Sequence, residues 1–375
     1  MRIIIVTHKL TLNDGQGRVN YELARHLALS GQRVHLIAGE VAPELRGLEN
    51  VDYTHASHGP LRIALLKNLW FGIHSGLVLR KLRSAEDVVI LNGAITIGSS
   101  DINVAHFVHH GWRTSPFYDA GRGLRGFYQR VYTRLNILLE RLAFQVSPHV
   151  VAVSGQVAGE LVAAGQAPRG ISVIPNGVDT REFVPGLESR TALGLPERPV
   201  IALFVGGLGT PRKNLDTVLH ALGEVPDMHL AVVGAHEATP YPRLARQLAV
   251  DDRVHFLGFR RDVPAIMRAG DLLVFPSRYE PFGLVLLEAM ASGLPVITCR
   301  TAGGAELVTE DCGVVVDEPN DVAAVAEAMR VVMADLNGRR TMPAAARRVA
   351  EEHDWSRMAA DYLALCLRVA GERGI

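Results

Sequence analysis

The chain has 375 residues, of which 48% are hydrophobic and 21% are charged, and these fractions are typical of a globular protein. At about 150 residues per domain, this length predicts two or three domains. The 39 basic and 39 acidic side chains cancel, which argues against a dedicated nucleic-acid-binding protein because such proteins carry a basic excess. Residues 1–180 hold 18 Lys and Arg against 13 Asp and Glu, and residues 181–375 hold 21 against 26. This asymmetry indicates two domains with different partners.

Cysteine usage and hydropathy indicate the cellular compartment of the protein. Cys299, Cys312 and Cys366 form no paired spacing, which is typical of reduced cytosolic thiols, and the sequence assigns them no structural role. The amino terminus is too short and strand-like for the apolar region of a signal peptide. No run reaches about 18 uncharged apolar residues, so no membrane-spanning helix is expected. We expect a cytoplasmic protein that at most contacts the inner face of the membrane peripherally.

Short β-branched runs alternate with longer helical patterns along the whole chain, which is typical of parallel βαβ units. In the first half, strands are predicted over residues 3–6, 34–38, 88–91, 104–108, 150–153 and 171–174. In the second half, strands are predicted over residues 200–205, 229–233, 254–256, 272–275, 295–298 and 313–316. Apolar residues at helical spacing predict a last helix from Trp355 to about Val369. The pattern predicts an α/β fold with two doubly wound parallel sheets.

A cluster of turn formers, Pro175–Asp179 followed by Pro185-Gly186, predicts a hinge between the two sets of strands. It divides the chain into an amino-terminal domain over residues 1–178 and a carboxy-terminal domain over residues 179–355. A helix over about 356–375 is predicted to pack back on the first domain. Because ligands bind at the carboxyl ends of parallel strands, we expect two Rossmann-like domains that face each other across a cleft holding the active site.

The first predicted βα turn is rich in glycine and reads Asn13–Arg18. Glycines let a loop approach a bound phosphate or sugar closely, and a following helix presents free amides. The full dinucleotide pattern is absent, because Asn20 stands where its third glycine would be. We expect Gly15 and Gly17 to line the ligand site.

Two segments of the first half are strongly basic. Residues 61–83 hold five basic side chains, no acidic ones and Trp70-Phe71 in the middle, and residues 113–134 hold five arginines against Asp119 alone. Basic amphipathic helices of this kind can lie on anionic lipid headgroups. The alternative is a half-buried helix with a solvated basic edge. Both interpretations stay open at this point.

His106, His109 and His110 follow a predicted strand that ends near Val108. No carboxylate or cysteine accompanies them at metal-ligand spacing, so no metal site is expected. A histidine here could donate a hydrogen bond to a sugar hydroxyl or stabilise developing charge.

The segment Phe204–Asp216 runs from a strand through glycines and basic residues into a helix. This order places Lys213 at the mouth of a βα turn, where a cation can neutralise a diphosphate leaving group. The alternative is a solvated lysine at the start of a helix.

The segment Asp271–Ile297 combines a buried strand, a loop with Glu280 and a helix that begins near Gly283. The amides of Gly283, Leu284 and Val285 form an anion site at the positive end of the helix dipole. Glu288 follows Glu280 with seven residues between them, and each carboxylate can accept hydrogen bonds from sugar hydroxyls. The alternative is two solvated glutamates beside an ordinary helix.

This segment resembles the Glu-(seven residues)-Glu motif of the retaining glycosyltransferases of GT-B architecture, family four, also called glycosyl transferases group 1. The similarity includes Pro276-Ser277, the run Glu288–Val296 and Gly303-Gly304-x-Glu306. It extends over most of the chain and is strongest over residues 200–320.

The resemblance implies that residues 1–178 bind the acceptor and residues 179–355 the nucleotide sugar, and it implies a role for each matched residue. Glu288 would hold the ribose, Glu280 the donor sugar and Phe259 the base, and a histidine near the donor sugar is best matched by His109, with His110 as the adjacent alternative. The family has an arginine where this chain has Gly207, and Arg212 could replace it. The implied catalytic residues are Glu280, Lys213 and His109. The implied donor-binding residues are Gly15, Gly17, Gly207, Arg212, Lys213, Phe259, Glu280, Phe282, Gly283, Leu284, Val285 and Glu288.

The implied function is a metal-independent, retaining transfer of a sugar from a nucleoside diphosphate sugar, a co-substrate, to an acceptor, with no further cofactor. The acceptor would be a glycan, a lipid-linked precursor or another cell-envelope precursor, and residues 61–83 and 113–134 would contact the membrane. Two alternatives stay open: a nucleotide-sugar epimerase of the same fold, and a non-catalytic nucleotide-sugar-binding protein, which the glycine at position 207 favours.

Overall fold

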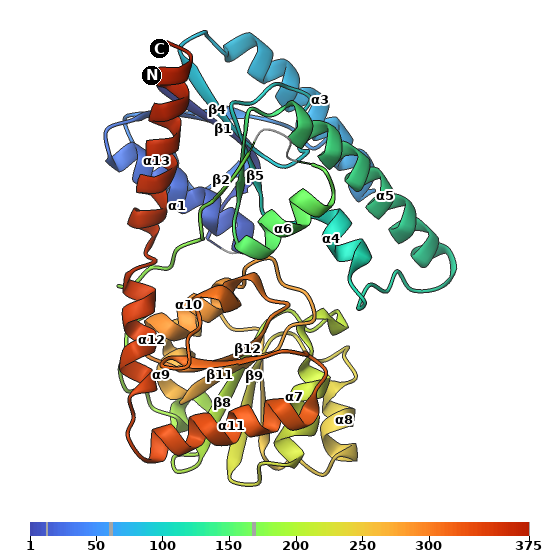
Figure 1. Ribbon diagram of the computed structural model, residues 1–375, viewed down its shortest axis with the longest axis vertical. Coiled ribbons are helices and arrows are strands. Elements are labelled where there is room, and N and C mark those ends of the chain that lie inside the picture. Colours follow the sequence, from blue (N-terminus) through green and yellow to red (C-terminus); the bar gives the residue numbers. More distant parts are fainter. Residues whose placement is uncertain (13, 60–62, 167–169, 375) are drawn as a thin grey trace. The chain divides into compact units, whose positions relative to one another are not determined.

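The computed structural model describes residues 1–12, 14–59, 63–166 and 170–374, and the chain divides into two compact units (Figure 1). The first unit comprises Met1–Asn176 together with Trp355–Ile375, and the second comprises Gly177–Asp354. The chain therefore returns to the first unit with its last helix. Asn13 of the predicted glycine-rich turn and Arg62 of the first basic segment lie outside the described residues.

Within the described part of the first unit, seven parallel strands form one sheet in the order β3-β2-β1-β4-β5-β6-β7. They are β1 (Arg2–Leu10), β2 (Arg33–Val41), β3 (Val51–His55), β4 (Asp87–Asn92), β5 (Ile102–Ala105), β6 (His149–Ala152) and β7 (Ile171–Val173). Ile3, Ile4 and Ile5 of the central strand β1 are fully buried. Consecutive buried residues are expected where helices cover both faces of a parallel sheet.

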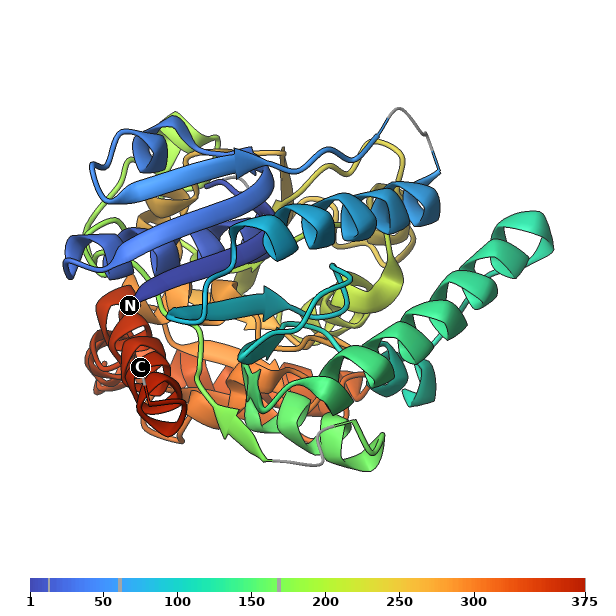
Figure 2. The same ribbon diagram turned by 90° about the horizontal axis from the view of Figure 1, so that it is seen from above.

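The helices of the first unit lie on both sides of this sheet (Figures 1 and 2). They are α1 (Gly15–Leu29), α2 (Pro43–Arg46), α3 (Ala64–Leu82), α4 (His109–Thr114), α5 (Gly123–Val146), α6 (Gly155–Ala163) and α13 (Trp355–Glu372). The last helix, α13, packs beside α1 and buries Tyr362 and Cys366. This burial raises the pKa of the Cys366 thiol to about 12, so Cys366 is a core residue and not a reactive one.

Within the second unit, six parallel strands form a sheet in the order β10-β9-β8-β11-β12-β13. The strands are β8 (Val200–Val205), β9 (Met228–Val233), β10 (Val254–Gly258), β11 (Leu272–Phe275), β12 (Val296–Cys299) and β13 (Gly313–Val316). The helices are α7 (Leu215–Gly223), α8 (Tyr241–Gln247), α9 (Val263–Ala269), α10 (Leu284–Ala291), α11 (Val322–Asn337) and α12 (Met342–Glu351). Three short 3-10 turns complete the unit: η1 (Thr191–Leu193), η2 (Pro211–Lys213) and η3 (Gly303–Leu307).

The two doubly wound parallel sheets confirm the predicted fold class. The predictions miss one strand and place the end of another wrongly. Strand β3 is not predicted, because it lies at the sheet edge and leaves Asp52 and His55 exposed, so it has no apolar run. The predicted strand over 104–108 is wrong at its end, since β5 stops at Ala105. Val108 is fully buried just before α4, so the apolar run there reflects burial and not strand pairing.

None of the helices that the structure describes is both long and apolar enough to cross a membrane.

Close packing in the second unit gives a stability prediction. A Cβ atom at Gly313 of β13 would lie 2.1 Å from the carbonyl oxygen of Val296, a backbone atom of the neighbouring strand. We expect Gly313→Ala to lower the free energy of unfolding by about 1–3 kcal/mol, because the strand must move. Urea unfolding of the intact chain measures this. Gly223→Ala at the end of α7 is the matched control, since its Cβ would meet only Val250 at 4.0 Å. Equal stability of the two variants would contradict this packing.

Candidate functional site

The loop between β8 and α7 carries Lys213 at the carboxyl end of the second sheet, in the turn η2. Asn214 follows at φ 68°, a left-handed conformation that asparagine tolerates better than most residues. The buried Asn214 side chain donates from Nδ2 to the carbonyl oxygens of Pro276 (2.8 Å) and Pro319 (2.5 Å). Asn214 therefore ties the loop that bears Lys213 to the end of β11.

The loop between β11 and α10 bears Glu280 and is tied to its neighbours through Ser277. The Ser277 hydroxyl donates to the carbonyl oxygen of Arg212 (3.0 Å). The Ser277 carbonyl oxygen accepts from Thr301 Oγ1 (2.6 Å) and Cys299 Sγ (3.0 Å), so Cys299 has a structural role that its spacing does not reveal. The amide of Glu280 donates to the carbonyl oxygen of Thr301 (2.9 Å). The ends of β8, β11 and β12 are thereby joined.

These ties bring Lys213 and Glu280 into contact. Lys213 Nζ forms an ion pair with Glu280 Oε2, and the two side chains are only 17% and 13% exposed. The ammonium also lies 5.0 Å from the centroid of the Phe275 ring, within cation–π range. An incoming anion would therefore have to compete with Glu280 for Lys213.

The start of α10 presents unused backbone donors beside this ion pair. Gly283 caps the helix at φ 91°, which favours glycine. Within the described part of the chain, the amides of Gly283, Leu284 and Val285 donate no hydrogen bond. The Gly304 amide holds the carbonyl oxygen of Phe282 at 2.7 Å and so fixes this end of the helix. Free amides at the positive end of a helix dipole are a site for an anion.

The side chains around this anion site differ in access. Phe282 is buried, so only its backbone can face a ligand, whereas Leu284 and Val285 are half-buried. Glu288 lies one turn into α10 and is half-buried. The structure thus collects Lys213, Glu280, Gly283, Leu284, Val285 and Glu288 at one end of the second sheet.

The resembled family has an arginine, a second cation beside the lysine, at the position that Gly207 occupies in this chain. Gly207 is exposed, and a Cβ atom there would meet nothing within 4 Å. The half-buried Arg212 side chain forms no hydrogen bond or ion pair with the residues that the structure describes, so its charge is available. Arg278 is not available to a ligand, because its guanidinium binds the carboxylate of Asp216 (2.6 Å) and the carbonyl oxygen of Pro211 (2.7 Å).

Two rings lie beyond the neighbouring strands β9 and β10. Phe259 directly follows β10 and is 72% exposed, so it is available to a ligand. His236 follows β9, and its ring centroid lies 5.0 Å from that of Phe256. The Nδ1 atom of His236 is buried and has no hydrogen-bond partner within the described residues. His236 was not predicted, because a lone histidine in a loop carries no pattern.

In the first unit, His109 is held by a buried carboxylate on α5. His109 Nδ1 donates to Glu140 Oε1 at 2.5 Å, and the His109 amide donates to Glu140 Oε2 at 3.0 Å. The Glu140 side chain is 7% exposed. This pairing fixes the ring and leaves Nε2 as the available atom, whereas no such partner orients the adjacent His110 within the described residues.

His106 serves the core. Its Nε2 donates to Asn92 Oδ1 at 2.7 Å, and burial lowers the pKa of His106 to about 4. Among the described residues, no group of three or more His, Cys, Asp or Glu side chains is placed to hold a metal ion.

The glycine-rich turn before α1 differs from the anion site of α10. The Gly17 amide donates to the carboxylate of Asp14 at 2.6 Å, and Asp14 caps the helix. A carboxylate at this helix start opposes a phosphate, because it occupies a donor and repels negative charge. Participation of Gly15 and Gly17 in donor binding stays a prediction.

Two family models match the chain. The model described as Glycosyltransferase Family 4 matches residues 13–182, and the model described as Glycosyl transferases group 1 matches residues 199–335. A D-inositol 3-phosphate glycosyltransferase of Salinispora tropica is 30% identical over 255 residues, which are 61% of this chain and 53% of that protein. The chain spans about half the length of the curated relatives it matches.

Two further proteins are similar. The lipopolysaccharide glucosyltransferase WaaG of Escherichia coli is 35% identical over 167 residues, which are 43% of this chain and 44% of WaaG. A crystal structure of WaaG, described as a glycosyltransferase of lipopolysaccharide biosynthesis, has a TM-score of 0.76 at 22% identity and covers 96% of this chain and 98% of its own. Anabaena HepE in complex with UDP and glucose has a TM-score of 0.71 at 20% identity, covering 98% and 99%. These structures share the fold.

Two half-buried histidines whose rings are removed from solvent predict an acid sensitivity. Burial lowers the pKa values of His8 and His106 to about 4 from 6.5. Below pH 6.5 the unfolded chain takes up protons that the folded chain refuses, so stability falls as the pH falls towards 4. We expect His106→Gln to reduce the loss between pH 7 and pH 5 by about 2 kcal/mol. Urea unfolding at both pH values measures it, with His220→Gln as the exposed control. An unchanged pH slope would contradict the burial of His106.

Proposed function

Since the chain belongs to the family 4 glycosyltransferases of GT-B fold, we propose that it moves a sugar from a nucleoside diphosphate sugar to an acceptor with retained configuration. The observation that carries this proposal is the Lys213–Glu280 ion pair beside the three unused amides at the start of α10. A cation and free amides suit a diphosphate, and a neighbouring carboxylate suits sugar hydroxyls.

The leaving diphosphate gains negative charge as the glycosidic bond breaks. The amides of Gly283, Leu284 and Val285 are fixed before the reaction, so they can stabilise this charge without reorganising, and Lys213 adds its charge once the diphosphate has displaced Glu280 from it. We assign them the charge-stabilising role, which makes the reaction metal-independent. When the diphosphate takes Lys213, Glu280 is released to accept hydrogen bonds from the donor sugar, and Glu288 is assigned to the ribose.

In this proposal retention follows from attack on the face of the donor sugar from which the diphosphate leaves, without a covalent glycosyl-enzyme intermediate. The departing phosphate takes the acceptor proton while the acceptor oxygen attacks the anomeric carbon from the same face. Arg212 is assigned as the second cation, because its guanidinium is available and Gly207 offers none. Phe259 is assigned to the base, which its exposure supports.

On the first unit, we assign His109 as the group that hydrogen-bonds a substrate hydroxyl through Nε2. Glu140 supports this assignment, because it fixes both the ring and the tautomer.

We propose a glycan, lipid-linked or other cell-envelope precursor as the acceptor, and a cytoplasmic enzyme that works at the inner face of the membrane. The cationic segments 61–83 and 113–134 support this location. The part that WaaG takes in lipopolysaccharide biosynthesis supports the acceptor class.

A thermal-shift screen tests the donor class. UDP-, GDP- and ADP-sugars are added to the full chain, and one nucleotide should raise the melting temperature, because a ligand that binds the folded state stabilises it. Incubation of that donor with an acceptor extract should then transfer sugar. A shift without transfer indicates a binding protein, and epimerised donor indicates the epimerase alternative.

Substitutions at the ion pair should separate binding from chemistry. We expect Lys213→Ala to lower kcat about 10²–10³-fold, because charge on the leaving group loses its partner. Glu280→Gln should lower kcat more than it weakens nucleotide binding. Turnover and the nucleotide-induced thermal shift are measured for both. Arg330→Ala and Glu327→Gln, an exposed ion pair of the same unit, are the controls. Unchanged turnover in Lys213→Ala would refute the assignment of this site to the leaving diphosphate.

The Glu140–His109 pair gives a test on the first unit. Glu140→Ala should lower kcat about 10²-fold, because His109 loses the partner that fixes its ring. Glu140→Gln should restore part of this loss, since the amide oxygen can still accept from Nδ1. Nucleotide affinity, measured by calorimetry, should stay constant in both variants, and Glu86→Gln is the exposed control. Parallel losses of kcat and melting temperature without rescue by glutamine would leave Glu140 a purely structural role and refute the positioning role.

A further inference from the structure

Helix α3 carries an apolar stripe that the fold leaves uncovered. Leu66, Trp70, Ile73 and Leu77 recur at the spacing of one helix face, and all four are exposed, Leu77 to 54%. Arg80 continues the same face at the end of the helix and is also exposed. The opposite face of α3 is also apolar and is buried, so the stripe is a second apolar face, and an exposed apolar patch of this kind normally marks a contact site.

The stripe cannot turn inwards, because the opposite face of α3 is fastened. Phe71 and Leu79 are buried in the core of the first unit. The amide of Ile97 donates to the carbonyl oxygen of Gly72 (3.1 Å), and Ser75 Oγ donates to Thr96 Oγ1 (2.7 Å). A Cβ atom at Gly76 would lie 2.3 Å from the Ile97 carbonyl oxygen, so helix and loop are in direct contact.

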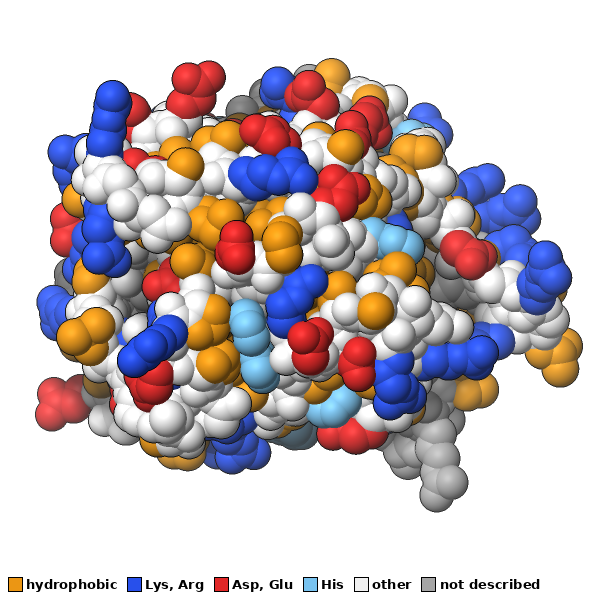
Figure 3. All heavy atoms as spheres, turned by 90° about the horizontal axis from the view of Figure 1, so that it is seen from below, with side chains coloured by type: hydrophobic (Ala, Val, Ile, Leu, Met, Phe, Trp, Pro, Cys, Tyr) orange, Lys and Arg blue, Asp and Glu red, His pale blue; other side chains and the backbone are white. Residues whose placement is uncertain are grey.

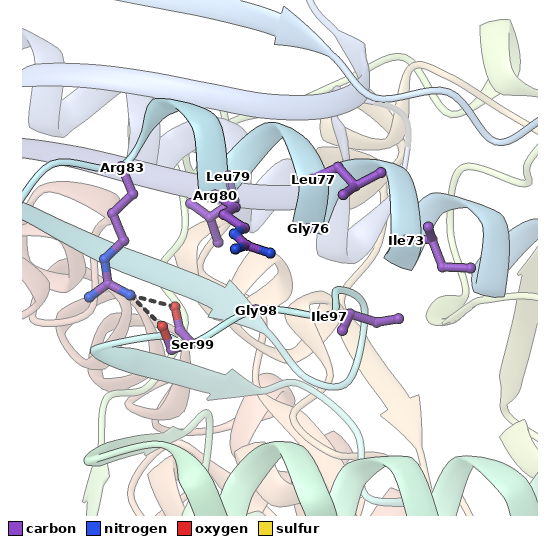
Figure 4. Close-up of a pocket in the computed structure, with 9 residues that line it drawn as sticks. All are labelled: Ile73, Gly76, Leu77, Leu79, Arg80, Arg83, Ile97, Gly98 and Ser99. Carbon is purple, nitrogen blue, oxygen red and sulfur yellow. Dashed lines mark hydrogen bonds between the residues drawn. The ribbon is translucent and has the colours of Figure 1, made fainter.

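The fastened loop and the stripe enclose a groove. A pocket of about 450 Å³ lies between α3 and residues 97–99, within the usual range of ligand pockets. Figure 4 shows Ile73, Leu77 and Arg80 from α3 on one side and Ile97 on the other. Ile97 is 66% exposed although its backbone is fixed. The groove is therefore lined mainly by apolar side chains and opens to solvent.

Two arginines line the groove, and only one is engaged. Arg83 donates to the carbonyl oxygen (2.8 Å) and hydroxyl (2.7 Å) of Ser99 and to both carboxylate oxygens of Asp101 (3.0 Å each). The Arg80 guanidinium has no hydrogen bond or ion pair with the residues that the structure describes. An apolar channel with an available cation at its end matches an acyl chain that carries an anionic head.

Helix α5, which neighbours α3, also exposes apolar side chains and carries basic ones. Helix α5 meets α3 where Tyr128 Oη accepts from the Leu65 amide (3.4 Å), and it leaves Leu124, Phe127, Leu138 and Val146 exposed, among others. Over α3 and α5 the one acidic residue is Glu140, which is buried against His109. Basic residues of the two helices are Lys67, Arg80, Lys81, Arg125, Arg130, Arg134 and Arg141. By contrast, acidic and basic side chains are interspersed over the face in Figure 3.

We propose that α3, α5 and residues 97–99 dock on an anionic bilayer, and that the groove receives one acyl chain of an anionic lipid whose headgroup binds Arg80. A bilayer supplies an apolar layer beneath anionic headgroups, which matches the exposed stripe and its cations. A second copy of this chain would bring cations against cations, so it is the poorer occupant. The proposal deepens the membrane contact proposed above but rests on no step of sugar transfer.

Vesicle binding of the full chain tests this site independently of activity. The chain should sediment with vesicles of phosphatidylcholine and phosphatidylglycerol in equal parts, and far less with phosphatidylcholine alone or in high salt. Phosphatidylglycerol brominated along its acyl chain should quench Trp70 fluorescence, and Trp70→Phe should remove the quenched component. Binding without quenching of Trp70 would refute insertion of the exposed stripe into the acyl layer, and no binding to anionic vesicles would refute the docking surface.

Matched variants localise the contact. Leu77→Asp should weaken vesicle binding about tenfold or more, because it places a charge in the apolar layer. Arg80→Gln should weaken it about fivefold. Leu367→Asp and Arg368→Gln, adjacent exposed residues on α13, are the controls and should bind as the native chain does. Equal losses in the controls would overturn the proposal, as would a dimer in sedimentation velocity that Leu77→Asp abolishes. Circular dichroism melts verify that each variant is folded.

Discussion

The buried amide of Asn214 is the interaction on which the candidate site depends. It binds carbonyl oxygens beyond β11 and before α11, so the loop that bears Lys213 cannot move without leaving buried acceptors unpaired. An unpaired buried polar group costs about 1–3 kcal/mol. Buried hydrogen bonds therefore fix the backbone of the three loops, and these loops bring the side chains of Lys213 and Glu280, which are 17% and 13% exposed, into one ion pair.

The parts predicted from sequence are those with a local pattern. Consecutive apolar residues identify the buried strands, and the position of Glu280 before a glycine-capped helix identifies the anion site, because both depend on neighbours in the sequence. Asn214, Glu140 and Arg278 were not predicted, although each holds part of a candidate site. Their partners lie 31 to 105 positions away, so only the folded chain shows them. The buried Glu140 is the sole carboxylate of α5, a weak pattern that could have directed attention to it.

Local sequence patterns give wrong predictions where a residue is buried without pairing in a strand, or bonds to a distant loop. Val108 extends an apolar run past the end of β5, and Cys299 looks incidental although its thiol supports the loop of Glu280. Glycine at position 207 is the clearest departure from the resembled family. The open space around it shows that packing did not demand a glycine there. In the proposed function, Lys213 and Arg212 supply the positive charge of the site.

The return of α13 to the first unit has a consequence for biosynthesis. Residues 177–354 form the second unit, so the ribosome completes that unit before it has made the helix that covers α1. Arg373 supplies further late contacts, to the carbonyl oxygens of Asp87 (2.7 Å) and Ala85 (2.6 Å). Domains usually fold as units in the order of their synthesis. In this chain the first unit cannot complete its packing until α13 has been synthesised, after the whole of the second unit.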